Sequence, residues 1–84
     1  MKTEKDFKNL LTDIGQSLAG LRMKKGYATI KAFAEKYDLP EIQYWRMEKG
    51  KANVTLRSLS RILRIHRLSV HEFFCMMQDQ KAAA

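Results

Sequence analysis

The sequence predicts an all-α fold, a compact domain of five helices. Of the 84 residues, 45% are hydrophobic, which suffices for one packed core at this chain length. The chain has only four glycines and one proline, too few for a turn-rich β fold. Apolar residues recur at spacings of three and four along most of the chain, as they do on one face of a helix.

The first helix is predicted from an apolar stripe with these members: Phe7, Leu10, Leu11, Ile14, Leu18 and Leu21. Two lysines followed by Gly26 suit the helix end, because cations favour the C-terminal dipole and glycine favours a left-handed residue. Gly15 lowers the stability of this helix by about 1 kcal/mol. Its start is open, since Thr3 and Thr12 could each be the N-cap. Residues 1–11 are therefore an N-terminal extension or extra turns of the first helix.

Two short helices follow. Thr29 can cap the second helix, whose inward positions are Ile30, Phe33, Ala34 and Tyr37. Pro40 ends it, because a residue that precedes proline avoids the helical conformation. The third helix then runs from Pro40 or Glu41 to Lys49, and Gly50 closes it.

The last two helices are predicted from their capping residues. Thr55 can cap the fourth helix, and its predicted inner face comprises Leu56, Leu59, Ile62, Leu63 and His66. Ser69 and Glu72 have the spacing of a capping box at the start of the fifth helix. The domain is expected to span residues 12–77, and residues 78–84 form a C-terminal tail.

Composition and charge restrict the class of protein. The formal net charge of +7 favours a polyanionic partner, while residues 26–50 carry four basic and four acidic side chains. Cys75 has no partner for an internal disulfide, and no apolar run is long enough for a membrane span or a signal peptide. We therefore expect a cytoplasmic protein without membrane association.

The sequence offers no catalytic constellation. It contains no nucleophile with a base beside it, no paired catalytic carboxylates and no phosphate-binding glycine loop, so we expect neither enzymatic activity nor a cofactor. His71 and Cys75 are four residues apart, a spacing that can hold a metal, but two ligands do not complete a tetrahedral site. No metal is predicted.

Residues 28–49 have the organisation of a helix-turn-helix. Two short helices are joined by a tight break, and the second is amphipathic, as reading of the DNA major groove requires. On a helical wheel Tyr44 and Met47 point inward, whereas Ile42, Arg46 and Lys49 gather opposite with Trp45 beside them. The pattern predicts a DNA-binding helix.

Over residues 12–75 the sequence resembles the lambda repressor and Cro family of helix-turn-helix proteins, also called the XRE type. Three groups of residues carry the resemblance: Ile14, Leu18, Leu21, Arg22 and Gly26; Phe33, Ala34, Asp38, Leu39, Pro40, Tyr44, Met47, Glu48, Lys49 and Gly50; and Leu59, Ile62, Leu63, Leu68, Ser69 and Phe73. The resemblance implies a lambda-repressor-like domain that binds double-stranded DNA, with the helix-turn-helix formed by the second and third helices.

The resemblance also implies roles for particular residues. Arg22 and Glu48 match a structural salt bridge. The positions that match DNA base contacts are Glu41, Ile42, Gln43, Trp45 and Arg46. The positions that match DNA backbone contacts are Thr29, Lys31, Lys49, Lys51, Asn53 and Arg57. A homodimer interface is expected at the C-terminal apolar residues Phe73, Phe74, Met76 and Met77, because one side of one helix cannot bury them all.

The sequence departs from the family at five places. Ile30 stands where glutamine often opens the second helix, and Asp38 replaces a common glycine in the turn. Pro40 replaces the usual capping serine. His66 and Arg67 occupy positions where leucine and glycine are common.

The leading interpretation is a sequence-specific transcriptional regulator, a repressor from a mobile element or a bacterial operon. One alternative is an antitoxin that neutralises a toxin and binds its own operator. Another is a docking module whose main partner is a protein. Arg57, Arg61 and Arg64 form a stripe on the fourth helix, and such a stripe is most often simply solvated. Two other interpretations are that Arg57 contacts DNA and that Arg61 and Arg64 bind an acidic partner protein.

Overall fold

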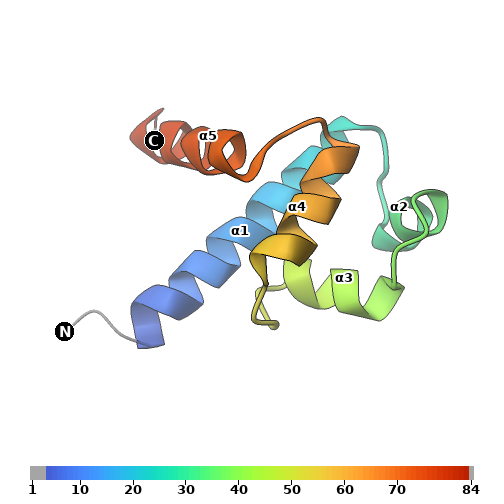
Figure 1. Ribbon diagram of the computed structural model, residues 1–84, viewed down its shortest axis with the longest axis horizontal. Helices are drawn as coiled ribbons and strands as arrows, with labels where there is room; N and C mark the ends of the chain where they lie inside the picture. Colours follow the sequence, from blue (N-terminus) through green and yellow to red (C-terminus); the bar gives the residue numbers. More distant parts are fainter. Residues whose placement is uncertain (1–3, 84) are drawn as a thin grey trace. The chain divides into compact units, whose positions relative to one another are not determined.

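The computed structural model describes residues 4–83, with side chains described for residues 4–79. Residues 4–83 contain five α-helices and no strand (Figure 1). The helices are α1 (Glu4–Lys24), α2 (Ile30–Lys36), α3 (Glu41–Glu48), α4 (Leu56–Ile65) and α5 (Val70–Ala83). The predicted all-α class and helix order are confirmed for this part of the chain.

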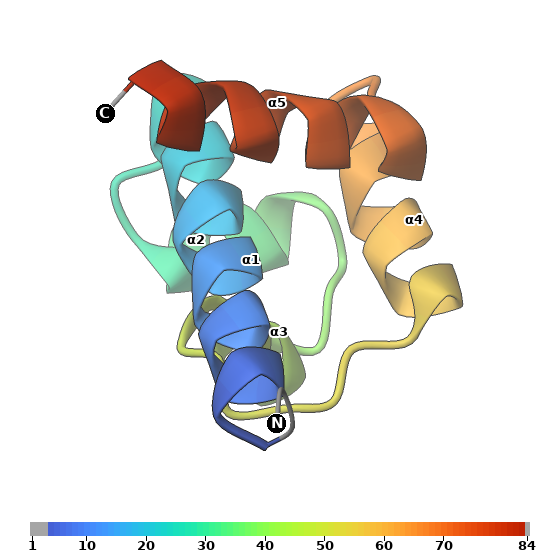
Figure 2. The same cartoon turned by 90° about the vertical axis from the view of Figure 1, so that its left-hand side faces the viewer.

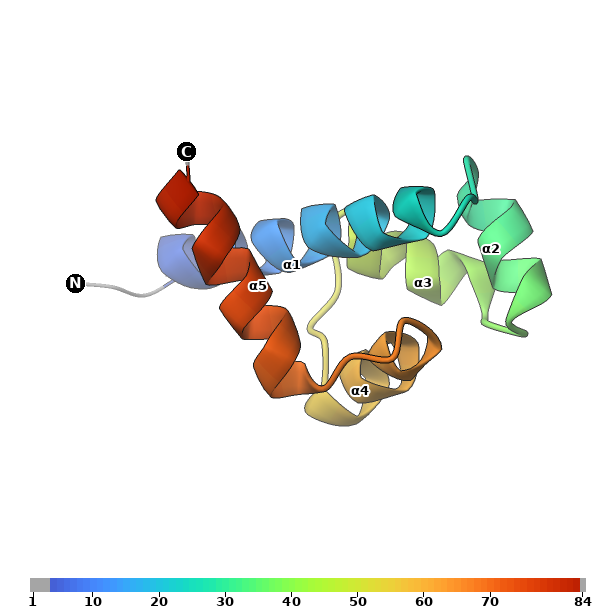
Figure 3. The same ribbon diagram turned by 90° about the horizontal axis from the view of Figure 1, so that it is seen from above.

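The chain divides into two units between Asn53 and Val54. The first holds α1, α2 and α3, and α3 packs against both other helices. Figure 3 shows α3 beside the C-terminal half of α1, with α2 beyond that end. The second unit holds α4 and α5, which pack together and point in different directions (Figure 2).

Helix α1 is longer than its packed part. It is continuous from Glu4, so residues 4–11 form additional turns of this helix, while the alternative cap Thr3 lies outside the described residues. Every side chain from residue 4 to residue 10 is exposed, including Phe7 and Leu10 of the predicted apolar stripe. The stripe is therefore buried only from Leu11 onward.

The buried apolar residues of the first unit are Leu11, Ile14, Leu18, Phe33, Ala34, Leu39, Tyr44 and Met47, and those of the second are Leu59, Ile62, Leu63, Phe73 and Met77. Phe33 contacts the rings of Tyr27, Tyr37 and Tyr44 at centroid distances of 5.0–5.6 Å. One prediction was wrong: Leu56, assigned to the inner face of its helix, is 68% exposed. As the first residue of α4 it lies to one side of the buried face formed by Leu59, Ile62 and Leu63.

The ends of α1 to α4 share one hydrogen-bonding pattern. In each, a backbone N–H donates to the carbonyl five residues earlier, as in a Schellman motif: Tyr27 to Arg22, Leu39 to Ala34, Lys51 to Arg46 and Leu68 to Leu63. The residue before each of these donors has a positive φ: Gly26, Asp38, Gly50 and Arg67. Asp38 and Arg67 thus adopt the left-handed conformation that glycine favours.

The predicted N-caps are present. The Thr29 hydroxyl oxygen accepts a hydrogen bond from Ala32 N–H at 3.1 Å, and Thr55 caps α4 in the same way. In α5 the Ser69 N–H donates to the Glu72 carboxylate at 2.8 Å, while Glu72 N–H donates to the Ser69 hydroxyl. The hydrogen bond from the Ser69 N–H to the carboxylate holds the pKa of Glu72 below its usual value.

Candidate nucleic-acid interface

Helix α3 has one buried and one exposed face. Its inward residues Tyr44, Met47 and Glu48 are each at most 7% exposed. Because successive residues turn by about 100° around a helix, the remaining positions of α3 face away from α1 and α2, against which its buried face packs. The exposed side chains are Glu41, Ile42, Gln43, Trp45 and Arg46, which are the five residues expected to contact DNA bases.

The exposed face mixes apolar, amide and charged groups. Ile42 is 76% exposed and Trp45 is 41% exposed, so two large apolar side chains lie at the surface of a helix of eight residues. An open depression beside them is lined by Pro40, Glu41, Ile42, Gln43 and Arg46. A solvated helix face would carry mainly charged residues, whereas this face offers apolar contact and directed hydrogen bonds together.

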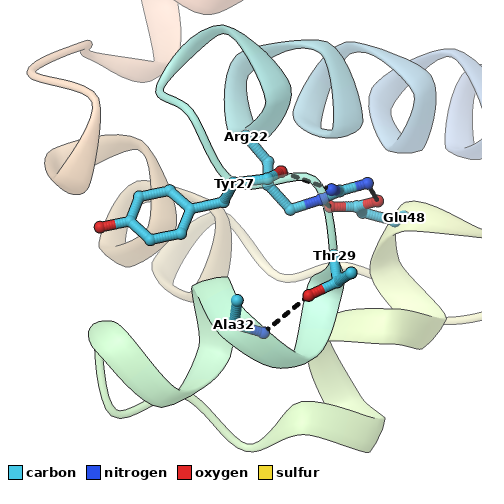
Figure 4. A network of polar contacts seen from close by, with 5 residues as sticks. All are labelled: Arg22, Tyr27, Thr29, Ala32 and Glu48. Carbon is cyan, nitrogen blue, oxygen red and sulfur yellow. Dashed lines mark hydrogen bonds and ion pairs between the residues drawn. The ribbon is translucent and has the colours of Figure 1, made fainter.

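The buried ion pair between Arg22 and Glu48 attaches α3 to α1. Arg22 Nε donates to one Glu48 carboxylate oxygen at 2.8 Å, and Nη2 donates to the other at 3.2 Å. Nη1 donates to the Tyr27 carbonyl at 2.8 Å, so the guanidinium also holds the segment that follows α1 (Figure 4). The hydrogen bond to Glu48 raises the pKa of Arg22. The two residues expected to form a structural salt bridge therefore do so.

Tyr44 lies next to this pair on the inward face of α3. Its ring is 1% exposed, and burial raises the pKa of its phenol well above the usual value. The hydroxyl lies in the electrostatic field of Glu48 and Arg22, yet among the described residues it has no partner within hydrogen-bond geometry. Tyr44 is therefore a packed aromatic side chain of the core that holds the inward face of α3.

Two glycines bring α1 against the end of α3. A Cβ atom at Gly15 would lie 2.7 Å from the Met47 carbonyl oxygen and closer still to that of Glu48. At Gly50, where φ is +68°, a Cβ atom would lie 3.0 Å from the Cα atom of Thr12. Sequence reasoning treated Gly15 only as a weak point of the helix. The available signal was its place within the apolar stripe, three and four residues from Leu18 and Leu11.

The residues expected to contact the DNA backbone are divided between the units. Lys31, Lys49, Lys51 and Asn53 are exposed in the first unit with α3. Thr29 is exposed there too, and its hydroxyl oxygen caps α2. Arg57 is exposed on α4, in the second unit.

The four residues predicted for the dimer interface differ in exposure. Phe73 is fully buried and Met77 is 7% exposed, so both belong to the core of the chain and offer a partner almost no surface. Phe74 and Met76 are half-buried and keep accessible surface. The physical reason is helical spacing, because Phe73 and Met77 are one turn apart on the inward face of α5.

His71 and Cys75 lie together on α5, with 3.6 Å between Cys75 Sγ and His71 Nε2. Within the described part of the chain, no group of three or more potential metal-ligating side chains occurs. Among the same residues no helix is both long enough and apolar enough to cross a bilayer. Comparisons with protein-family models, curated proteins and solved structures gave no match.

Proposed function

We propose that this chain is a sequence-specific DNA-binding transcriptional regulator, a repressor, that inserts α3 into the major groove. The observation that carries the proposal is the exposed face of α3, which presents Ile42, Gln43, Trp45 and Arg46. The buried face of the same helix is attached to α1 by the ion pair between Arg22 and Glu48. Fixed geometry matters because readout of bases requires side chains to be held close to their productive positions.

In this proposal α2 and α3 form a helix-turn-helix. The two short helices are joined by residues 37–40, and the left-handed residue Asp38 reverses the chain between them. An α-helix with its side chains is about 10–12 Å across, which suits a major groove of about 12 Å. Arg22 and Gly15 hold the last turn of α3, leaving its first turn and its exposed face to enter the groove.

The side chains on the exposed face match the chemistry of base edges. Arg46 can donate two hydrogen bonds to guanine O6 and N7, and Gln43 can pair with the N6 and N7 edge of adenine. Ile42 can contact a thymine methyl group, while Glu41 can accept from cytosine N4. Trp45 adds apolar surface at the edge of the same face.

Lysines in the first unit would hold the phosphates. A dimer fits this role, because two copies of α3 would read half-sites about one helical turn apart. We assign the dimer contact to Phe74 and Met76, the accessible members of the C-terminal apolar group. If each subunit neutralises about four phosphates, the logarithm of the affinity should fall against the logarithm of the salt concentration with a slope on the order of −7.

The test compares two arginine variants on duplex DNA enriched from a random pool. Arg46→Ala should weaken binding by about fivefold to 150-fold per subunit, the cost of about 1–3 kcal/mol for one bidentate base contact. Arg64→Ala removes the same charge from α4 and should change the affinity by less than about twofold. Equal affinities for wild type and Arg46→Ala, together with a flat salt response, would contradict the proposal and favour a protein-docking module.

A further inference from the structure

The outward face of α4 carries an arginine stripe that is separate from the base-reading face of α3. Arg57, Arg61 and Arg64 are all exposed and follow one another at spacings of four and three. On a helical wheel they lie opposite the buried residues Leu59 and Ile62. The three arginines therefore span about 10.5 Å along the helix axis on its solvent side.

Acidic residues are scarce in the second unit, whose sequence contains only Glu72 and Asp79. Residues 49–71 contain no Asp or Glu, and the next carboxylate, Glu72, is engaged in the cap of α5. Among the described residues none of the three arginines takes part in an ion pair. The stripe is thus cationic without a partner in the part of the chain that the structure describes.

The stripe also acts against the stability of its own helix. Arg57 is the second residue of α4, where a cation opposes the helix dipole, and no acidic residue occupies that first turn. Pairs of like charge at spacings of three and four destabilise a helix further. Local rules of this kind are broken mainly at functional sites, which indicates an external use for the charge.

The choice of cation indicates the kind of ligand. Up to Lys51, nine of the eleven cationic residues are lysines, and beyond it four of the five are arginines. Lysine serves as a mobile point charge, whereas the planar guanidinium forms paired hydrogen bonds with a carboxylate. Leu56, 68% exposed, borders the stripe and adds an apolar contact that a phosphate backbone does not need. These features favour a protein surface over a nucleic acid.

We infer that the outward face of α4 is a docking surface for an acidic helical segment of another protein. Carboxylates repeated at positions i, i+4 and i+7 of a helix lying along α4 would meet Arg57, Arg61 and Arg64 in turn, because both helices share the same rise per residue. An apolar residue beside them would contact Leu56. This interaction is separate from the reading of DNA by α3.

The test measures the binding of a fluorescein-labelled synthetic helical peptide to the full chain. The peptide carries glutamate at i, i+4 and i+7 with leucine on the flanking positions, and a second peptide has glutamine in place of glutamate. Wild type should bind the glutamate peptide saturably and at least about tenfold more tightly than the glutamine peptide. Amide chemical-shift changes should concentrate on α4.

Matched charge variants separate a defined surface from general attraction. Arg61→Glu with Arg64→Glu should weaken the glutamate peptide by about tenfold or more. Lys5→Glu with Lys8→Glu, on the exposed first turns of α1, makes the same change in net charge and should leave the affinity within about twofold. Helix content by circular dichroism verifies that both variants fold.

Three results would overturn the inference. The first is no saturable binding of the glutamate peptide by wild type, and the second is equal weakening by the two charge variants. The third is a loss of duplex-DNA binding by the α4 variant as large as its loss of peptide binding, which would assign the surface to nucleic acid. DNA binding that depends on Arg46 would be unaffected by the first two results, so the two proposals fail independently.

Discussion

Replacement of Gly15 by alanine tests whether α1 and α3 approach as closely as the structure indicates. The new Cβ atom would lie 2.7 Å from the Met47 carbonyl oxygen, while ordinary contact begins at 3.4 Å, so the two must separate by at least about 0.7 Å. The obstructing atoms are backbone, and displacing them also moves Glu48 away from Arg22. Overpacking of this kind costs about 1–3 kcal/mol, and we expect the upper part of that range.

Gly20→Ala is the matched control, because a Cβ atom at Gly20 would meet nothing within 4 Å. It lies in the same helix and should raise the free energy of unfolding by up to about 1 kcal/mol through helix propensity alone. Urea denaturation followed by circular dichroism should therefore place Gly15→Ala below Gly20→Ala by about 2–3 kcal/mol, or at least about 8 °C in Tm. Emission from Trp45, the one tryptophan of the chain, reports on α3. Equal stabilities of the two variants would refute the close approach.

Further substitutions test the helix ends and the ion pair. Arg67→Gly should raise the free energy of unfolding by about 0.5–1 kcal/mol, because glycine adopts the left-handed conformation without strain. Gly26→Ala should lower the free energy of unfolding by about 1 kcal/mol for the converse reason. Changes of the opposite sign in thermal denaturation would refute both expectations. Glu48→Gln leaves the buried Arg22 guanidinium without a full counter-charge and should cost about 3 kcal/mol in urea denaturation, whereas a cost below about 1 kcal/mol would contradict a tight pair. The pKa of Glu72 is lowered from 4.5, so its stabilisation is present above about pH 4.5 and is lost as the pH falls through the lower folded value. The Tm of Glu72→Gln should lack this component of the acid dependence, and identical pH profiles would disprove the assignment.

Most of the fold was predictable because each helix carries its own signals. The capping box of Ser69 and Glu72 and the left-handed Gly26 depend on residues that are neighbours in the chain, and both form as expected. The spacing of Tyr44 and Met47 on a wheel likewise predicted the inward face of α3. Local chemistry and helical periodicity suffice for such features.

What the sequence did not predict depends on long-range packing. Gly15 looks unfavourable within its own helix, and its purpose is visible only when the end of α3 lies against it. Phe73 and Phe74 are adjacent and identical, yet only the first is fully buried, because the packing of α5 decides which of its faces is covered. The apolar pattern predicts that most of these side chains are buried, but it does not predict which of them stay exposed and accessible to a partner.

Arg67 adopts a backbone conformation that is unusual for a residue with a side chain. The residue adopts the left-handed conformation that glycine would adopt at the same place, with φ of +58°. Asp38 does the same between α2 and α3, and aspartate tolerates this conformation better than arginine. The backbone thus keeps the same helix endings with and without glycine.

Selection of bound sequences from a pool of random duplex DNA tests the central claim most directly, with Arg46→Ala selected in parallel. The proposal predicts that wild type enriches a two-fold symmetric sequence with half-sites about one helical turn apart, and that Arg46→Ala loses the preference for one base pair in each half-site. No enriched sequence from a folded wild-type protein, or an unchanged preference in Arg46→Ala, would contradict reading of DNA by α3.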